Sequence, residues 1–319
     1  MVGSNVVSND RTQPIICIMG PTATGKTDAA AACFDTFAAE IISVDSSLVY
    51  RGMDIGTAKP DAEFLRRYPH QLVDVRDPSD TYSVADFVED ATHQITRARD
   101  KGRVPVLVGG TMFYFNALEK GMDSLPSANA KLRDQFTQMA SAEGGWPALH
   151  EQLKAVDPVS AVRIDPNDAQ RIQRALEIVT LTGAPVPAPN ADRQSALGPF
   201  IKIGLSFSDR SVLHQRIALR FEQMMEIGLL NEVQQLLDSG VSSQATSMRM
   251  IGYRQILEFL QGDTTKEEAV QKGIAATRQL AKRQLTWMRN QSNLIWWVDR
   301  GLQNKEFSEL MTLITQYLR

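Results

Sequence analysis

An eight-residue glycine loop, GPTATGKT, constrains the fold of this chain more than any other stretch. It fits the pattern G-x-x-x-x-G-K-[ST], in which backbone N–H groups of a tight turn converge on phosphate oxygens at a helix start. The apolar run IICIM precedes the loop, and the alanine-rich stretch DAAAACFDTFAAE follows it. A strand, a phosphate loop and a helix therefore follow one another, which favours a functional loop over a plain surface loop.

Each residue of this P-loop is a candidate for binding a diphosphate. The backbone N–H groups, the ammonium group of Lys26 and the hydroxyl of Thr27, a candidate ligand of Mg²⁺, would supply the contacts. The loop recognises a diphosphate whatever is attached to it, so ATP is one possible ligand. The candidate binding residues are Gly20, Pro21, Thr22, Ala23, Thr24, Gly25, Lys26 and Thr27.

Further apolar runs predict an α/β fold with a parallel sheet. EIISVD, ending at Asp45, and VPVLVGG, ending at Gly110, are short and unalternating, as expected of strands buried on both faces. The stretch SVADFVEDATHQITRARDKG between them has helical spacing and ends at Gly102. Residues 200–207 and 294–299 add two later strands. We expect a P-loop parallel sheet core flanked by helices, with a helical insertion domain.

The domain boundaries follow from a change of pattern after Gly121. Between about residues 125 and 198 the apolar runs have helical spacing and are interrupted by proline-rich stretches such as APVPAPN. We predict a flexible tail over residues 1–13 and a catalytic core over residues 14–120 and 200–319. Residues 121–199 are predicted to form the helical insertion.

Composition excludes several classes of protein. No apolar run approaches the roughly 18 residues of a membrane span, and the opening stretch MVGSNVVSNDRTQ lacks the features of a signal peptide. The two cysteines form no disulfide or metal framework, so we expect a cytoplasmic protein without a membrane partner. The net charge of −3 offers no general surplus of cations, so any surface that binds nucleic acid must be local.

Polar residues follow the predicted strands at the edge where α/β sheets present their ligands. Asp45 ends one strand, and Thr111 comes directly after another. An aspartate at this position could ligate Mg²⁺, cap a helix or act as a general base, and composition alone favours the first two roles. The P-loop, Asp45 and Thr111 are therefore expected to share one pocket.

Seven stretches together resemble the tRNA dimethylallyltransferases, also called tRNA isopentenyltransferases. In chain order they are GPTATGKT, ISVDSSLVYRGMDIGTAKP, PHQLVDVRDP, VGGTMFYF, NDAQRIQRALE, MIGYRQ and TRQLAKRQLTWMR. Thr24, Ser47 and the short APVPAPN stretch depart from the family's usual pattern. The resemblance implies transfer of a dimethylallyl group from dimethylallyl diphosphate to N6 of the adenosine 3′ of the anticodon. It also implies a monomer that uses Mg²⁺.

The resemblance assigns roles to individual residues. Asp45 is expected to accept the proton of the adenine amine, and Thr111 to contact the target nucleotide beside it. Lys26, Thr27 with Mg²⁺, and an arginine are expected to meet the charge of the leaving diphosphate. The segment LHQRIALR offers Arg216 and Arg220 for this purpose, and we expect Arg216.

The target adenosine must leave the stack of the anticodon loop, which requires a surface that holds RNA. Taken singly, the basic residues of the predicted helices would be solvated charges, but their stretches match the family's tRNA-contacting segments. The insertion is accordingly expected to bind the anticodon region. The candidate tRNA-binding residues are Asp45, Ser46, Ser47, Leu48, Thr111, Arg133, Gln170, Arg171, Arg174, Arg249, Gly252, Tyr253, Arg254, Arg278, Lys282, Arg283 and Arg289.

Two other functions stay open from the sequence. A small-molecule or nucleotide kinase would use the same loop for ATP, but it needs an arginine-rich lid that we do not find. A non-catalytic RNA-binding module would bind tRNA without releasing diphosphate. The run Met112, Phe113, Tyr114 and Phe115 is a candidate prenyl pocket, although aromatic runs beside a strand are usually core.

Overall fold

The chain divides by its contacts into two compact units. The structure, a computed structural model, describes residues 13–318 apart from 124, 143, 189–194 and 299–303. The larger unit comprises residues 1–120 and 194–319, and the smaller unit comprises residues 121–193. Almost all of the tail predicted over residues 1–13 lies outside the described residues, as does the end of the strand predicted over 294–299.

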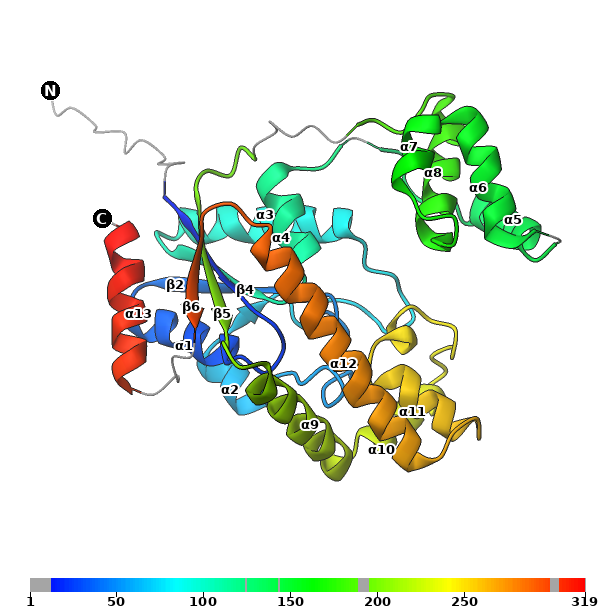
Figure 1. Ribbon diagram of the computed structural model, residues 1–319. Coiled ribbons are helices and arrows are strands. Elements are labelled where there is room, and N and C mark those ends of the chain that lie inside the picture. The colour runs from blue at the N-terminus through cyan, green and yellow to red at the C-terminus, as the bar shows by residue number, and fades with distance from the viewer. Residues whose placement is uncertain (1–12, 124, 143, 189–194, 299–303, 319) are drawn as a thin grey trace, which may run out of the picture. The chain divides into compact units, whose positions relative to one another are not determined.

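The larger unit contains a parallel sheet (Figure 1). Within the described residues the strand order is β3-β2-β4-β1-β5-β6, and every neighbouring pair is parallel. All residues of β1, β2 and β4 are buried, which confirms the strands predicted from unalternating apolar runs. The strands are β1 Ile15–Met19, β2 Ala39–Val44, β3 His70–Gln71, β4 Val104–Gly109, β5 Phe200–Ser206 and β6 Leu294–Val298.

Helices cover both faces of this sheet (Figure 1). One face packs against α1 and α13, and the other packs against α3, α4, α9, α11 and α12. Two hydrophobic cores therefore enclose the sheet, which confirms the predicted α/β class. The helices of this unit are α1 Lys26–Thr36, α2 Ala62–Arg67, α3 Val84–Asp100, α4 Met112–Lys120, α9 Arg210–Ile227, α10 Leu229–Asp238, α11 Tyr253–Leu260, α12 Lys266–Arg289 and α13 Asn304–Tyr317.

Local signals fix the ends of two of these helices. Ser83 caps α3 by accepting a hydrogen bond from the Asp86 N–H, and Gly102 follows the helix with φ of +66°, close to the predicted bounds. Helix α1 ends earlier than the alanine-rich stretch predicts, because Phe37 takes an extended conformation and Ala39 already pairs in β2. The two-residue strand β3 is not predicted, since it is too short to show a period.

The smaller unit is helical. Its helices are α5 Ala130–Ala140, α6 Gly145–Val156, α7 Pro158–Arg163 and α8 Ala169–Thr182. They pack around a separate core formed by Phe136, Leu149, Leu153, Ala161, Ile172, Ala175 and Leu176. The unit thus has its own buried apolar centre, as a small domain requires. Among the described helices of the whole chain, none combines the length and the apolar character that a membrane span requires.

Candidate active site

The P-loop connects β1 to α1 in a conformation suited to an anion. Ala23 and Gly25 both have positive φ, of 64° and 83°, and Gly25 is the N-cap of α1. The Lys26 ammonium donates to the Pro21 carbonyl at 2.6 Å. Burial lowers the pKa of Lys26 to about 8, with Arg220 adding to the decrease and Asp45 opposing it. A bound anion would therefore stabilise the charged form of Lys26.

Asp45 follows β2 directly, and its carboxylate is held from one side. Its Oδ1 accepts hydrogen bonds from the Ser47 N–H at 2.9 Å and from the Ser47 hydroxyl at 2.5 Å. The Ser46 N–H donates to Thr111 Oγ1 at 3.0 Å, and the Thr111 N–H donates to the Val44 carbonyl at 3.2 Å. These hydrogen bonds connect the loops after β2 and β4. Because Ser47 binds only Oδ1 of Asp45, Oδ2 can bind another partner.

Two glycines allow the end of β4 to approach its neighbours. A Cβ atom on Gly109 would lie 2.0 Å from the Val44 carbonyl oxygen, and one on Gly110 would lie 2.5 Å from Gln284 Nε2. The Gln284 amide donates to the Gly110 carbonyl at 2.9 Å. A larger residue at Gly109 would collide with the end of β2, and one at Gly110 would collide with α12, so the VGG sequence shapes the base of the site.

The loops enclose a pocket of about 460 Å³ within the larger unit. Eleven of the candidates line it: Thr22, Lys26, Thr27, Asp45, Ser46, Ser47, Leu48, Thr111, Arg220, Tyr253 and Arg283. Its apolar side includes Met112, Phe113, Ile217, Phe221, Met224 and Trp287. Of the four residues considered for a prenyl pocket, Met112 and Phe113 line it, whereas Tyr114 and Phe115 belong to the buried core.

The structure distinguishes the two candidate arginines of α9, Arg216 and Arg220. Arg220 lines the pocket with Lys26 and Asp45, and it donates to Thr22 Oγ1 at 3.4 Å and to the Ala58 carbonyl at 3.2 Å. Burial lowers the pKa of Arg220, and Asp45 partly offsets this effect. Arg216 is exposed, donates to the Ala23 carbonyl at 2.8 Å, and lines a second hollow at the P-loop with Lys26, Thr27 and Arg220. Both arginines therefore lie at the P-loop, but only Arg220 also lines the pocket that contains Asp45.

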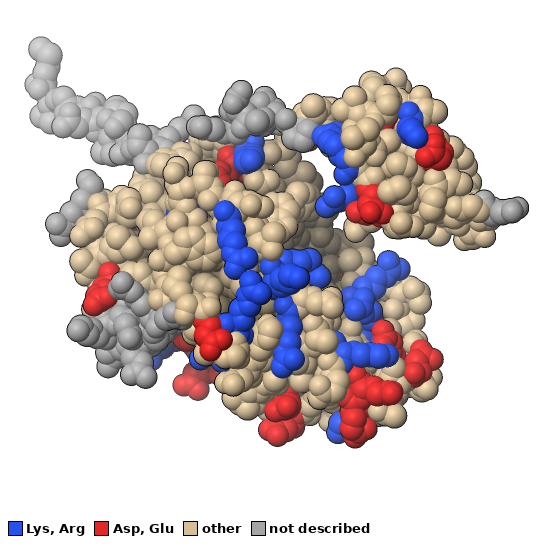
Figure 2. Space-filling model, in the orientation of Figure 1, with Lys and Arg blue, Asp and Glu red and all other residues tan. Residues whose placement is uncertain are grey.

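Lys and Arg side chains of the larger unit gather on the face that carries α12 (Figure 2). Lys282, Arg283 and Arg289 are exposed on this helix, and Arg278 is partly buried. The exposed candidates outside α12 are Arg249 and Arg254. This arrangement provides the local basic surface that an acidic chain needs in order to bind a polyanion.

Tyr253 does not belong to that surface. Its side chain is fully buried, and its hydroxyl donates to the Glu232 carboxylate at 2.6 Å. The adjacent candidate Gly252 is also buried, with φ of +94°. These two residues, which the sequence groups with the RNA contacts, are therefore placed to support the fold beside the pocket.

In the smaller unit, two of the candidate arginines pair with the same buried glutamate. Glu177 is fully buried. Its carboxylate accepts two hydrogen bonds from Arg133, each at 3.0 Å, and one from Arg174 at 2.5 Å. Burial would raise the pKa of Glu177, but hydrogen bonds from Arg133, the Asn129 N–H and Arg174 lower it to about 2. Arg133 and Arg174 thus stabilise this unit.

The neighbouring candidates are more accessible. The Arg171 side chain is 69% exposed and pairs with Asp168 at 3.3 Å, and Gln170 is exposed. A surface ion pair of this kind contributes little to stability, at most about 1 kcal/mol. Arg171 is consequently the arginine of this segment that is best placed to meet a phosphate.

The sequence-based candidates miss buried polar side chains near the pocket, among them Ser43, Gln284 and Glu232. Gln284 lines the pocket, and its Oε1 is buried without a hydrogen-bond partner in the described part of the chain. Glu232 binds a loop that forms one wall of the pocket. Gln284 lies inside the stretch TRQLAKRQLTWMR, but only contacts across the fold distinguish it from its neighbours.

Comparisons with known proteins agree with this geometry. The sequence profile described as IPP transferase matches residues 48–291. The tRNA dimethylallyltransferase of Thiobacillus denitrificans is 54% identical over 280 residues, which cover 87% of this chain and 89% of that protein. The tRNA dimethylallyltransferase 2 of Hahella chejuensis is 46% identical, with 98% of each chain covered.

Solved structures share the fold. The tRNA isopentenylpyrophosphate transferase of Bacillus halodurans aligns with a TM-score of 0.71 and 39% identity, covering 96% of this chain and 97% of that one. A eukaryotic dimethylallyltransferase acting on tRNA shares the fold with a TM-score of 0.78 at 24% identity. These matches confirm the resemblance seen in the sequence, and the chain belongs to the IPP transferase family.

Proposed function

We propose that this chain transfers a dimethylallyl group from dimethylallyl diphosphate to N6 of the adenosine 3′ of the anticodon in tRNA. One observation carries the proposal: the P-loop lysine, Arg220 and the Asp45 carboxylate line a single pocket that also has an apolar side. The relatives named above support the same activity, since they are tRNA dimethylallyltransferases that match most of the chain.

The proposed reaction is a substitution at the allylic carbon. The lone pair of N6 forms the new N–C bond while the bond from that carbon to the diphosphate oxygen breaks, and its electron pair leaves with the diphosphate. The adenine amine is a weak nucleophile because its lone pair is delocalised into the ring. Asp45 would accept the N6 proton as the bond forms, which is the usual role of a positioned carboxylate.

Positive groups around the P-loop would stabilise the leaving diphosphate. Lys26 and Arg220 both lie in the pocket, and the backbone N–H groups at the start of α1 face the same anion site. Charge that accumulates during bond cleavage is stabilised best by donors already in place. The apolar side, with Phe113 and Met224, would hold the five-carbon chain.

The donors in the pocket fit Mg²⁺. This ion prefers oxygen ligands and usually takes only one or two from the protein, with substrate phosphates and water as the others. Thr27 and Asp45 both offer oxygens in the pocket, and Thr27 would hold the ion with the diphosphate. In the described residues no group of three His, Cys, Asp or Glu side chains forms a metal site of its own. When bound, Mg²⁺ would neutralise part of the diphosphate charge.

The tRNA would contact exposed basic residues of both units. On the larger unit these are Arg249, Arg254, Lys282, Arg283 and Arg289, and on the smaller unit Arg171 is the best placed. Thr111 would contact the flipped nucleotide beside Asp45. We further propose that the protein acts as a monomer in the cytoplasm, which sedimentation at several concentrations and fractionation of cells would test.

The direct test is incubation with unmodified tRNA and dimethylallyl diphosphate, followed by mass analysis of the nucleosides. We expect an adenosine carrying one added dimethylallyl group, and release of one diphosphate for each. The alternative of a small-molecule or nucleotide kinase predicts that ATP, rather than dimethylallyl diphosphate, stabilises the protein against heat. Phosphoryl transfer from ATP without any prenylated nucleoside would contradict our proposal.

A further inference from the structure

The loop between β2 and α2 contains a stretch, MDIGTAKP, that has no part in the chemistry described above. It nevertheless borders the pocket, because Gly56, Thr57, Ala58 and Pro60 are among the lining residues. Ala58 has φ of +54°, an uncommon conformation for a residue with a side chain. A loop in such a conformation persists only where its surroundings hold it.

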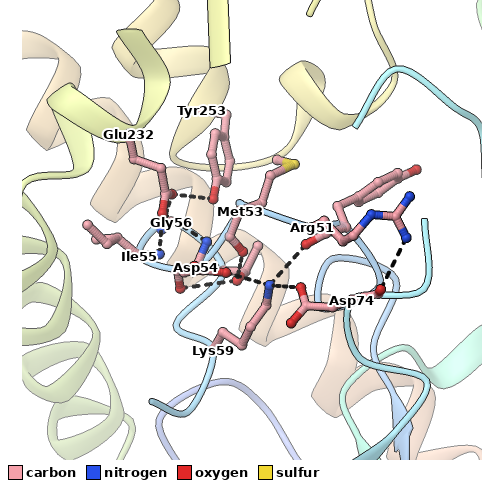
Figure 3. Close-up of polar contacts among 11 residues, drawn as sticks. Arg51, Met53, Asp54, Ile55, Gly56, Lys59, Asp74, Glu232 and Tyr253 are labelled. Atoms are coloured by element: carbon pink, nitrogen blue, oxygen red, sulfur yellow. Dashed lines mark hydrogen bonds and ion pairs between the residues drawn. The ribbon is translucent and has the colours of Figure 1, made fainter. Parts of the chain in front are cut away.

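Glu232, on α10, holds this loop through its backbone (Figure 3). The residue is 8% exposed, and its carboxylate accepts hydrogen bonds from three consecutive N–H groups. The distances are 2.8 Å from Asp54, 2.7 Å from Ile55 and 3.0 Å from Gly56. Because this buried carboxylate accepts so many hydrogen bonds, the turn cannot shift without losing several of them at once.

Tyr253 completes the contacts of Glu232 (Figure 3). Burial and the adjacent Glu232 raise the pKa of this phenol far above its usual range, so it stays protonated and donates. A Cβ atom on Gly56 would lie 2.5 Å from the Tyr253 ring, so only glycine lets the turn pack against it. The turn is therefore fixed by both hydrogen bonds and close packing.

Lys59 fixes the other side of the loop (Figure 3). Its ammonium group forms ion pairs with Asp54 and Asp74 and donates to the Tyr50 carbonyl at 2.9 Å. The Lys59 side chain is only 3% exposed, whereas its two carboxylate partners remain accessible to water. Glu232 and Lys59 thus hold Asp54 and its neighbours between them.

The loop in turn contacts the arginine of the pocket. Of the two hydrogen bonds that Arg220 donates, one goes to the carbonyl of Ala58, two residues after the turn that Glu232 holds. Glu232 itself does not line the pocket. Contacts therefore run without a break from Glu232 through the backbone of residues 54–58 to the guanidinium group beside Asp45.

We propose that Glu232 is a positioning residue, which sets the guanidinium group of Arg220 for the diphosphate by fixing the backbone of residues 54–58. The proposal rests on the proposed function, since it concerns the diphosphate site of that reaction. Glu232 touches no reacting group, and its effect on the substrate passes through Arg220. If Glu232 only stabilised the fold, its effect on diphosphate binding would not depend on Arg220 in particular.

The variant Glu232→Gln tests this placement. The glutamine has nearly the same shape but turns an NH₂ group toward a donor of the turn or toward Tyr253, which breaks at least one hydrogen bond. The matched control is Glu226→Gln, which removes the same charge from an exposed position on α9. We expect Glu232→Gln to bind inorganic diphosphate with Mg²⁺ about ten-fold more weakly, and the control to bind like the parent protein.

A double-mutant cycle with Arg220→Ala distinguishes positioning from general destabilisation. If Glu232 acts through Arg220, Glu232→Gln should have little further effect on diphosphate affinity in the Arg220→Ala background. The effects of Glu232→Gln in the two backgrounds should then differ by a factor of at least about three. A second cycle with Arg216→Ala should show independent effects, because Arg216 binds the Ala23 carbonyl and not this loop. Affinity for tRNA should stay within about two-fold of the parent in Glu232→Gln.

Two results would overturn the proposal. One is unchanged diphosphate affinity in Glu232→Gln, and the other is a double variant whose loss of diphosphate affinity equals the product of the losses in Glu232→Gln and Arg220→Ala. If Glu232→Gln does not fold, Tyr253→Phe takes its place in the cycle, since it removes one hydrogen bond and keeps the ring. Diphosphate binding needs no prenyl transfer. A parent protein that binds diphosphate but forms no prenylated adenosine would contradict the proposed function and still leave the coupling measurable.

Discussion

Removing Arg220 should impair catalysis far more than removing Arg216. Arg220 lies in the pocket with Lys26 and Asp45, so the two cations face one carboxylate before the diphosphate arrives. A unit charge about 4 Å from a phosphate oxygen contributes about 4 kcal/mol at an effective dielectric constant near 20. Arg220→Ala should therefore lower kcat/KM for dimethylallyl diphosphate by about 10² to 10³.

Arg216→Ala is the matched comparison on the same helix. Arg216 is exposed and holds the Ala23 carbonyl, so solvent screening should limit its loss to about 1 kcal/mol, or roughly five-fold. The assay is steady-state prenyl transfer at saturating tRNA, with dimethylallyl diphosphate varied. A larger loss in Arg216→Ala than in Arg220→Ala would refute the assignment of Arg220 to the diphosphate.

Three further predictions follow from charges in the structure. Burial lowers the pKa of Lys26 to about 8, so diphosphate affinity should fall as pH rises through that value. Binding of diphosphate near pH 8 should therefore take up protons, which calorimetry in two buffers of different ionisation enthalpy detects. Folding lowers the pKa of Glu177 from 4.5 to about 2. Its contribution to the free energy of unfolding, up to about 3 kcal/mol, is therefore present above pH 4.5 and is lost as pH falls toward 2. Acid unfolding of Glu177→Gln should lack this loss of stability. Arg171→Ala should reduce the slope of log affinity for tRNA against log salt concentration by roughly 0.7 to 0.9 without lowering thermal stability. Arg174→Ala should instead lower thermal stability. Identical salt slopes for the parent protein and Arg171→Ala would show that Arg171 contacts no phosphate.

The sheet and its ligand edge were predictable because they depend on local patterns. Unalternating apolar runs identified β1, β2 and β4, and the P-loop pattern located the anion site between β1 and α1. Asp45 was predictable as a site residue because it follows a buried strand directly, at the edge where parallel strands present their ligands.

The choice between Arg216 and Arg220 was not predictable, because the two residues lie four positions apart on the same face of one helix. Which of them enters the pocket depends on the carbonyl of Ala58, a contact between residues 162 positions apart in the chain. The ion pairs of Arg133 and Arg174 likewise depend on Glu177, whose burial is decided by packing of the smaller unit. Charge at helical spacing alone does not separate such residues from RNA contacts.

Support for the pocket from Glu232 was equally hidden from the sequence. The three N–H groups it binds lie more than 170 positions earlier in the chain. A glutamate on an amphipathic helix would ordinarily be expected at the surface, and only the fold shows that this one is buried against a turn.

The central claim is that Asp45 accepts the proton of the adenine amine while the P-loop holds the diphosphate. Its most direct test is the single-turnover rate of Asp45→Asn, measured as prenylated adenosine in unmodified tRNA. Asparagine keeps an Oδ1 that accepts from Ser47, so the loop should stay in place, and tRNA and diphosphate affinities should stay within about three-fold. The account predicts a rate lower by about 10² to 10⁴. A rate close to that of the parent protein would contradict it.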